Sequence, residues 1–596
     1  MAQERWIAPV SFLLLLAAYH LIFGQFFPTR NGTLGTDYSR VLPDLLDGYF
    51  WFRSNGLFEP FWFTPSFCGG LPALGDPQSG YYSVAQFLAF LINPLASVYA
   101  TVLLFASLGF WGFYLLLRAC FGASRQAAVV GGALFMFNGF FIHRMLIGHF
   151  AFHGVMLIPL IAYFLLRPAV GTRILGIFQN GAVAGCMLAY GVYSGMVHLL
   201  LPCALAVLGM AAVHGLAGRE SAGFVRRSLV AALVAVGLAA AKLAAALSFL
   251  RNFPRSDISL PGAASVWDAL HLLFSALFFS PADIAQQAQP LVAGVEVILE
   301  RHEWEYGITM VPLLLIVAGA VLLLVRTRGA LPRPSAAKWV WLALLGLVLA
   351  LPLALNIHTP EWNAFLKQVP LIKSSSNLLR WFLVYIPLAI LAAALLLDRI
   401  ALRESRRNLL VGAALAALVL INAAKDRDFY HDQHYRPDTI VNAWQAARAG
   451  TAAPRIRYIG AYVDAENHIE MRGNGNDLIA AGASQFACYN PIFGYRLERF
   501  PAKTLHPGPV LMETDGVLNL KNPVCYLYPE QNSCAPGDHF TAAQREAAQA
   551  FADYKPYPVE LSAAQSAANA ATRATLALLA LLLVATLANS AKFADN

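Results

Sequence analysis

Charged residues are scarce in this chain of 596 residues: Asp, Glu, Lys and Arg make up 13%, against about 25% in an average soluble domain. Hydrophobic residues make up 58%, which exceeds the roughly 45 to 50% of soluble proteins. This composition excludes an ordinary soluble protein. It predicts a protein that crosses a membrane several times.

The sequence also lacks the short motifs that would assign several functions directly. There is no Walker motif, so ATP-driven transport has no support. The seven cysteines include no Cys-x-x-Cys pair and no His/Cys spacing typical of zinc sites. We find no internal repeat, although transporters often have one. The net charge of +8 lies largely in Arg residues at the ends of apolar runs, so we expect no nucleic-acid partner.

Apolar runs of bilayer-spanning length recur along the whole chain. A spanning helix needs about 20 mostly apolar residues, because its backbone polar groups find no water in hydrocarbon. We predict about twelve spans on this basis: 7–27, 97–117, 126–142, 151–166, 174–192, 195–216, 228–250, 308–325, 339–355, 381–397, 408–424 and 572–590. No small-residue cleavage site follows the first run, which we interpret as an uncleaved anchor.

The distribution of Lys and Arg predicts the orientation of these spans. Successive loops alternate between the two sides of the membrane, and the positive residues near span ends fall in the loops of one side: Arg118, Arg125, Arg167, Arg173, Arg219, Arg226, Arg227, Arg326, Arg328, Arg333, Lys338, Arg399, Arg403, Arg406, Arg407 and Lys592. Such residues favour the cytoplasmic side, so both termini are expected there. The apolar segment 81–94 is short, and counting it as a span would invert every later loop. We expect it to lie along the outer interface.

Four segments are then expected on the outer side: 28–96, 251–307, 356–380 and 425–570. The last segment is long enough to fold by itself, and in it Asp, Asn, Gly, Pro and Tyr replace the Ala and Leu that dominate the rest of the chain. We predict an all-α polytopic membrane protein with a small extracytoplasmic α/β domain. Its parts are a transmembrane domain over 1–424, the soluble domain over 425–570, and a C-terminal transmembrane helix over 571–596.

Two cysteines in the predicted soluble domain flank a turn-rich stretch on the oxidising side of the membrane. Cys525 and Cys534 are therefore candidates for a disulfide. Two unpaired thiols are the alternative, because spacing alone does not fix the distance between their Cα atoms.

The first outer loop carries four charged residues at helical spacing. Asp37, Arg40, Asp44 and Asp47 would form one polar stripe if the segment is helical. The simplest interpretation is the solvated face of an interfacial helix, on which Asp47 in particular would be dispensable. Their position just beyond an anchor helix and before an aromatic stretch, residues 49–63, instead favours contact with a lipid-linked substrate at headgroup depth.

Further short motifs follow these four residues in a characteristic order. They are Pro60-Phe61-Trp62, Cys68-Gly69-Gly70-Leu71-Pro72, Gln78-Ser79-Gly80, Phe137-Asn138-Gly139-Phe140 with Arg144 and Gly148-His149, Glu305-Tyr306-Gly307, and Asn377 to Arg380. Over about residues 1–425 this order resembles YfhO-like members of the GT-C superfamily of membrane glycosyltransferases. The chain departs from relatives with a DxD motif, because Tyr38 follows Asp37. This leaves a divalent metal an open possibility.

The resemblance implies an enzyme of the bacterial inner membrane with its active site on the outer, periplasmic face. It would transfer a sugar from a polyprenyl-phosphate donor to a glycan, lipid or protein acceptor. We expect no other cofactor, apart from the open question of the metal. Asp37 matches the catalytic position of the family and would act as the base, which implies inversion at the anomeric carbon. Asp44 is the second candidate, or it orients Asp37 through Arg40.

Breaking the bond to the donor phosphate also requires positive charge near the departing oxygens. Arg380 is the first candidate, with Lys373 and Arg144 as helpers and His149 as a hydrogen-bond donor. Snorkelling at the end of a span is the alternative explanation for Arg380 and Lys373.

Two further charged residues have open roles. Glu305 holds a sugar hydroxyl or Arg380, or it is a plain interfacial charge. Lys242 lies inside a predicted span, where a charge is costly unless it is paired or faces water. It contacts the lipid phosphate or pairs with another helix.

Two other function classes remain open from the sequence. A transporter or flippase of lipid-linked sugars would also explain many spans and an intramembrane Lys242. A membrane assembly factor whose outer domain binds a partner is the third possibility. Carboxylate-bearing outer loops and the lack of repeats favour the enzyme.

Overall fold

The structure is a computed structural model that describes most of the chain. It leaves out residues 1–5, 169–172, 220–221, 253–258, 280–291, 294–300, 328–334, 371, 374, 376, 401–403, 426–434, 452–453, 461–475, 487, 491–504 and 595–596. Arg328, Arg333 and Arg403 thus lie outside the described residues.

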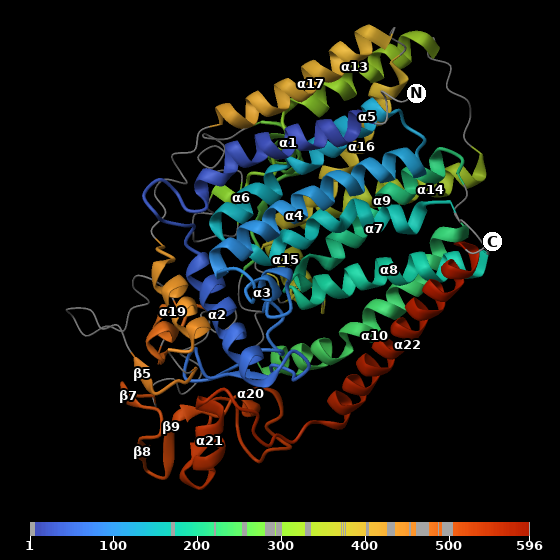
Figure 1. The fold of residues 1–596 in the computed structure, drawn as a ribbon. Coiled ribbons are helices and arrows are strands. Elements are labelled where there is room, and N and C mark those ends of the chain that lie inside the picture. The colour runs from blue at the N-terminus through green and yellow to red at the C-terminus, as the bar shows by residue number, and fades with distance from the viewer. Residues whose placement is uncertain are drawn as a thin grey trace.

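Long helices packed side by side form a bundle, and the short strands gather at one end of it (Figure 1). We call this end the loop end. The bundle helices are α1 (Ile7–Phe23), α4 (Pro94–Leu115), α5 (Arg125–Met136), α6 (Gly139–Ile147), α7 (Ile158–Leu166), α8 (Arg173–Tyr193), α9 (Leu200–Leu216), α10 (Ala222–Asn252), α13 (Met310–Thr327), α14 (Ala336–Leu355), α16 (Tyr385–Arg399), α17 (Glu404–Ala424) and α22 (Ala563–Ala594). Each predicted span overlaps at least one of these helices, although the first half of 151–166 lies on η4 (Phe150–Leu157), a 3₁₀ helix.

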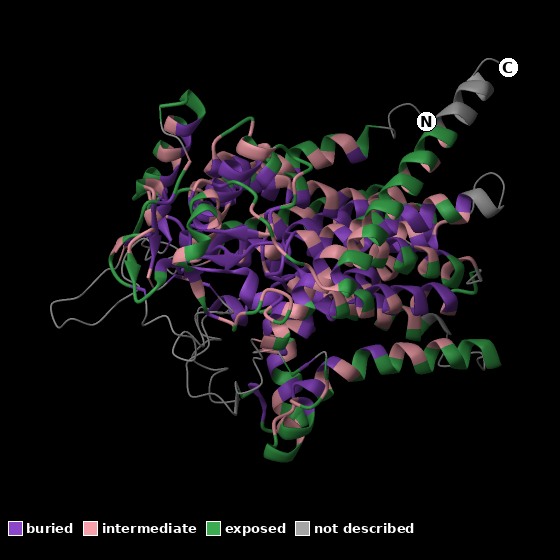
Figure 2. Ribbon diagram, turned by 90° about the horizontal axis from the view of Figure 1, so that it is seen from below, coloured by how far each residue is buried: buried purple, intermediate pink, exposed green. Residues whose placement is uncertain are grey.

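The bundle has the properties of a membrane-embedded protein. Within the described residues, nine helical segments are long and apolar enough to cross a bilayer. Buried residues fill the middle of the bundle, while several outer helices expose apolar side chains (Figure 2). A polytopic membrane protein is therefore supported, and the count of twelve spans stays a prediction. Segment 81–94 contains only the short α3 (Val84–Leu88), as expected if it does not cross the membrane.

Two helix breaks at the loop end shape the region of interest. Asn138 ends α5 and caps α6, because its side chain accepts a hydrogen bond from the backbone N–H of Phe141 at 3.0 Å. The helix α6 ends at Gly148, whose φ of 104° suits glycine. A Cβ at Gly148 would lie 2.6 Å from the backbone nitrogen of Tyr38. The glycine thus lets the residue that follows it, His149, approach the first loop.

The first loop contains the predicted helix as α2 (Tyr38–Asn55). Leu42, Leu45 and Leu46 turn inward at helical spacing and are buried. Pro43 has no backbone N–H, so the carbonyl of Ser39 is not used inside the helix. That carbonyl instead accepts a hydrogen bond from the backbone N–H of Asn476 at 3.0 Å.

The segment after α17 is a mixed α/β region with two three-stranded sheets. Its elements are α19 (Asp438–Ala449), β5 (Tyr458–Gly460), β6 (Ala483–Gln485), β7 (Gly508–Pro509), β8 (Glu513–Thr514), β9 (Val517–Lys521), α20 (Val524–Leu527), β10 (His539–Thr541) and α21 (Arg545–Ala552). In one sheet β5 pairs in parallel with β6 and antiparallel with β7; in the other, β9 pairs antiparallel with β8 and β10. The domain boundaries at 425 and 570 stay a prediction.

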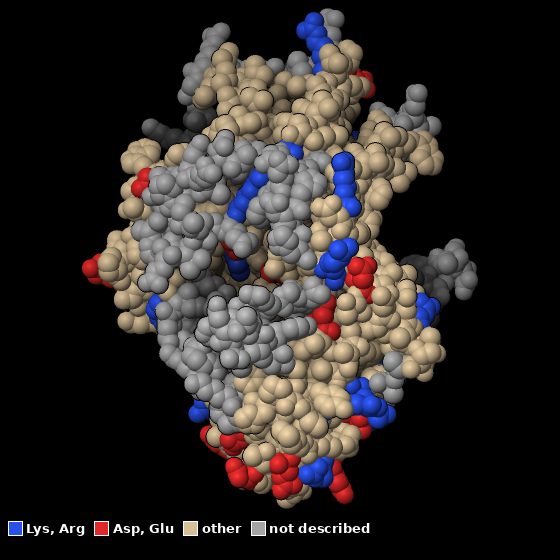
Figure 3. Space-filling view, turned by 90° about the vertical axis from the view of Figure 1, so that its left-hand side faces the viewer, with Lys and Arg blue, Asp and Glu red and all other residues tan. Residues whose placement is uncertain are grey.

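This α/β region is joined tightly to the first loop. A disulfide links Cys68 with Cys488, whose Cα atoms lie 5.1 Å apart. The backbone N–H of Lys521 donates to the carbonyl of Gly69 at 2.8 Å, and one hydrophobic core runs through both parts. The predicted pairing of Cys525 with Cys534 is also present, with Cα atoms 5.7 Å apart. Seen end-on, the loop end carries both acidic and basic side chains (Figure 3).

The remaining short elements also lie between bundle helices in the sequence. They are β1 (Phe63–Thr64), β2 (Leu71–Pro72), β3 (Gly262–Ala263), α11 (Val266–Phe278), β4 (Val292–Ala293) and α15 (Pro360–Leu366). Of these, β1 pairs with β2 and β3 with β4, both antiparallel.

Candidate functional site

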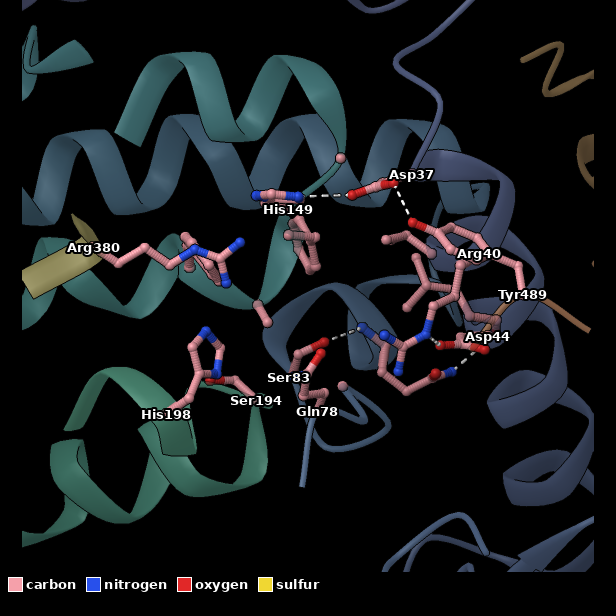
Figure 4. A pocket seen from close by; sticks show the side chains of 18 residues that line it. Asp37, Arg40, Asp44, Gln78, Ser83, His149, Ser194, His198, Arg380 and Tyr489 are labelled. Carbon is pink, nitrogen blue, oxygen red and sulfur yellow. Dashed lines mark hydrogen bonds and ion pairs between the residues drawn. The ribbon is translucent and has the colours of Figure 1, made fainter. Parts of the chain in front are cut away.

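A cavity at the loop end brings together residues from distant parts of the chain (Figure 4). It encloses about 970 Å³, part of it open to solvent. Its polar lining comes from α2, the segment after β2, the turn after α6, the turn before α9, the start of η8 (Leu379–Val384) and the α/β region: Asp37, Arg40, Asp44, Gln78, Ser83, Gln86, His149, Ser194, His198, Arg380 and Tyr489.

Asp37 is held between two hydrogen-bond donors. The hydroxyl of Tyr489 donates to its Oδ1 at 2.6 Å, and His149 Nε2 lies 2.9 Å from its Oδ2. Burial favours the neutral acid, but these two hydrogen bonds and the neighbouring histidines outweigh it and lower the pKa of Asp37 to about 2. Asp37 is therefore ionised at neutral pH.

Asp44 lies one to two helical turns away in a different environment. Arg40 Nε lies 3.4 Å from its Oδ2, and Arg40 also contacts Asp76 at 3.3 Å. Burial, together with the nearby Asp47 and Asp76 carboxylates, outweighs the opposing charge of Arg40 and raises the pKa of Asp44 to about 7. Asp44 thus exists in both protonation states near neutral pH.

Arg380 projects into the cavity on the side opposite Asp37 and Asp44 (Figure 4). It pairs with Glu303 through both Nε, at 3.1 Å, and its terminal nitrogen. Glu303 also accepts from Arg144 at 3.1 Å and from Asn377 at 3.0 Å. Burial opposes ionisation of Glu303, but the two guanidinium groups hold its pKa well below the usual range. One carboxylate thus faces two guanidinium groups, which leaves this wall with excess positive charge.

Four predicted site residues lie away from the cavity lining. Arg144 is fully buried behind it, with its guanidinium 4.1 Å from the ring centroid of Phe140. Lys373 is exposed on the loop before η8. The other two, Glu305 and Lys242, are buried in contacts of their own.

The contacts of Glu305 match none of the roles left open for it, and the contacts of Lys242 are with the protein itself. Glu305 lies 3.0 Å from His143 and 2.9 Å from Arg301, whereas its neighbour Glu303 pairs with Arg380. Lys242 donates to the backbone oxygen of Ser79 at 2.8 Å and to its hydroxyl at 3.1 Å. This lysine thus ties α10 to the first loop.

Asp47 does not lie on a solvated face, so that expectation is wrong. Its side chain is buried and accepts hydrogen bonds from the hydroxyls of Thr64, Tyr81 and Tyr554, at 2.8 to 2.9 Å, and from Ser66. The helix α2 is covered on this side by the loop around β1 and by the end of the α/β region. The spacing of the stripe gave no sign of that cover.

Sequence reasoning missed Glu303 and Tyr489. Glu303 lies two residues before the Glu305 that was singled out, and only the fold shows which of the two faces Arg380. Tyr489 follows Cys488, whose disulfide with Cys68 places it beside Asp37. The two cysteines in segments expected on the same side of the membrane were the one available signal.

Three residues near Asp37 have the side chains of metal ligands. Ligand atoms of His149, His302 and Glu303 lie within 4.8 Å of one another. However, both oxygens of Glu303 already face the guanidinium of Arg380, and Arg144 binds the same carboxylate. A divalent cation would meet this positive charge, so the donor set fits a divalent metal poorly. The excess charge fits an anion better.

An apolar groove of about 460 Å³ lies among the bundle helices. It is lined by α7, α8, α9, α10, α14 and Trp381. Trp381 directly follows Arg380, so consecutive residues of η8 line the groove and the polar cavity.

The sequence matches no protein-family model, and no curated protein is significantly similar to it. The function is therefore argued from the cavity itself.

Proposed function

We propose that this protein is an integral membrane glycosyltransferase that moves a sugar from a polyprenyl-phosphate donor to an acceptor hydroxyl on a glycan, lipid or protein. The observation that carries the proposal is the cavity itself. Carboxylates line one side, Arg380 lines the other, and an apolar groove begins at the next residue, Trp381. This is the combination of surfaces that an amphiphile with an anionic phosphate and a long apolar chain requires.

Arg380 would bind the donor phosphate. As the bond between the anomeric carbon and the phosphate oxygen breaks, negative charge builds up on that oxygen, and a fixed guanidinium stabilises it. Glu303, which also accepts a hydrogen bond from Asn377, holds Arg380 in place before the substrate arrives. Because Arg144 shares Glu303, pairing does not cancel the positive charge of the wall.

The acceptor would enter at the wall that carries Asp37. Its hydroxyl must lose a proton as its oxygen attacks the anomeric carbon, so a proton acceptor is needed on the side away from the phosphate. Attack from that side displaces lipid phosphate in line and inverts the anomeric centre. Arg40 and Asp44 offer further polar contacts for sugar hydroxyls.

The apolar groove would hold the first isoprene units of the donor. The polyprenyl chain comes from the bilayer and not from water, so close packing against the groove, and not removal from water, would favour this position. The charge distribution along the sequence favours an outer-face position for the cavity, in a bacterial inner membrane on this proposal.

One argument for the flippase alternative no longer applies. It relied partly on an intramembrane lysine available to the cargo. Lys242 instead donates to the backbone and hydroxyl of Ser79. A transferase also makes better use of a proton acceptor and a phosphate site within one cavity.

Lipid binding and sugar transfer test the proposal together. The purified protein should retain polyprenyl phosphate or its glycosylated form, identified by mass spectrometry of extracted lipid. Radiolabelled sugar on such a donor should pass to an acceptor in a cell-envelope extract. Absence of both the lipid and the transfer, with a correctly folded protein, would remove the proposal.

A further inference from the structure

Asp37 and His149 form a hydrogen-bonded pair on the cavity wall, and the two residues have different capacities to take a proton. We infer that Nδ1 of His149 takes the proton from the acceptor hydroxyl, and that Asp37 is the positioning residue that holds His149 for this step. The inference rests on the proposed transfer reaction. It changes the assignment of the base from the carboxylate to the imidazole.

The carboxylate of Asp37 is already engaged on both oxygens. Tyr489 donates to Oδ1 at 2.6 Å and His149 Nε2 contacts Oδ2 at 2.9 Å. An attacking hydroxyl would have to displace one of these partners or share an oxygen with it. The same contacts lower the pKa of Asp37 to about 2, which makes it a weak proton acceptor for a hydroxyl.

His149 has one nitrogen bound and one available. Its Nε2 faces an ionised carboxylate, which accepts hydrogen bonds only, so Nε2 carries the hydrogen. Nδ1 then has a lone pair. Within the described residues this atom is buried and has no hydrogen-bond partner, although buried polar atoms are normally paired. Since His149 lines the cavity, an acceptor hydroxyl is the partner that this nitrogen would take.

The surroundings of His149 keep its lone pair free at neutral pH. Burial lowers its pKa below the ordinary value, and the charges of Arg380 and His302 act in the same direction against Asp37. The ring of His302 lies edge-on with its centroid 4.6 Å away, and that of Phe152 lies at 5.2 Å. These rings fix the plane of the imidazole.

The proton step balances as follows. The acceptor oxygen forms a bond to the anomeric carbon while its hydrogen passes to Nδ1 of His149. The bond from that carbon to the phosphate oxygen breaks, and its electron pair leaves on the phosphate beside Arg380. The products are the glycosylated acceptor, lipid phosphate and an imidazolium that Asp37 stabilises. The imidazolium then returns its proton to solvent.

Asp37 is required on this scheme for a reason other than proton transfer. An Asn at position 37 can present its amide N–H to Nε2 of His149, and Nε2 must then accept. The hydrogen moves to Nδ1, which can no longer take a proton. Asp37→Asn and His149→Gln should therefore both fail in kcat, although only one of them removes the imidazole.

The experiment compares transfer by wild type, His149→Gln, His149→Ala and Asp37→Asn, each as the full chain in lipid nanodiscs with a radiolabelled polyprenyl-phosphate sugar. Gln keeps an N–H donor for Asp37, so His149→Gln should fold and bind donor normally. Its kcat should fall by about 10² to 10⁴-fold, the usual contribution of general-base catalysis. Added imidazole should restore part of the kcat of His149→Ala and none of that of Asp37→Asn.

Two results would overturn the inference while leaving the proposed function intact. One is a kcat of His149→Gln within about threefold of wild type while Asp37→Asn is inactive, which makes Asp37 the base. The other is a kcat of His149→Ala that imidazole does not raise. If wild type itself transfers no sugar, the proposed function fails first, so the two failures are distinguishable.

Discussion

The carboxylates of Asp37 and Asp44 come from the start of one helix, α2, whereas Arg380 depends on Glu303, which lies in another loop. The two carboxylates of the first wall have a local origin in a helical repeat. Their hydrogen-bond partners, His149 and Tyr489, come from distant segments, as does the carboxylate that positions two guanidinium groups at the second wall. Only the spacing of the carboxylates is therefore encoded over a short stretch of sequence, while the proton-accepting pair and the anion-binding wall exist only in the folded bundle.

The largest effect is expected at the wall that carries Asp37, where sugar transfer should be lost while donor binding is retained. Asp37→Asn should lower transfer by about 10² to 10⁴-fold, because the proton-accepting pair is lost. Donor binding should persist, since the phosphate contacts lie at the other wall. The measurements are sugar transfer and retained lipid by mass spectrometry. Loss of lipid together with activity would show that the two walls do not act separately.

The next largest effect is expected on the free energy of unfolding, at the wall that carries Arg380 and Glu303. Glu303→Gln leaves the buried Arg144 without its carboxylate, and breaking a buried ion pair on one side costs about 3 to 5 kcal/mol. The melting temperature should fall clearly. The exposed Glu361→Gln is the matched control, expected to stay within about 0.5 kcal/mol of wild type. Equal melting temperatures for both variants would contradict the role given to Glu303.

Arg380→Ala should weaken donor binding as well as turnover, because the phosphate is present before and during the reaction. We expect roughly tenfold to a hundredfold weaker binding, as for loss of a charged hydrogen-bond partner. Lys373→Ala is the control, since this lysine is exposed and does not line the cavity. Titration with donor lipid checks both. Equal losses in the two variants would place the phosphate elsewhere.

A smaller effect is expected for the buried carboxylate on the far side of α2. Asp47→Asn should destabilise the protein by about 1 to 3 kcal/mol, because an amide cannot satisfy all the hydroxyl donors around it. Asp515→Asn, at an exposed turn, is the control. Thermal melting of both variants measures the difference. If Asp47→Asn melts like wild type, the hydroxyl cluster contributes little.

The last expected effect is a pH dependence of stability at Asp44. Its pKa is raised to about 7 in the folded state, so the folded protein binds this proton more tightly than the unfolded chain. That contribution to stability is full below the unfolded pKa, near 4, and is lost as the pH rises to about 7. Asp44→Asn cannot ionise, so its stability relative to wild type should increase from pH 5 to pH 8. Melting curves at the two pH values check the sign, and an unchanged difference would contradict it.

Much of the fold was readable from the sequence because apolar length and helical spacing are local properties. Every predicted span falls on helix, and the spacing from Asp37 to Asp44 does lie on a helix. His149, Arg380 and Asp37 were all named as candidates, and they line one cavity.

The expectation that was wrong and the residues that were missed all depend on contacts between distant segments. The burial of Asp47 requires the hydroxyl of Tyr554, about 500 residues away in the chain, and the pairing of Tyr489 with Asp37 requires the Cys68–Cys488 disulfide. The choice between Glu303 and Glu305 as the partner of Arg380 depends on how a loop packs between two helices. No periodicity in a single sequence reports these contacts.

Sugar transfer by the wild-type protein is the most direct test of the proposed glycosyltransferase activity. The wild-type protein is reconstituted in vesicles with a polyprenyl-phosphate carrying a radiolabelled sugar, and the label is followed in the presence of cell-envelope acceptors. We expect the label to leave the lipid and appear on the acceptor, with release of an equal amount of polyprenyl phosphate. Label that stays on the lipid, whether or not the lipid changes leaflet, would contradict the proposed activity.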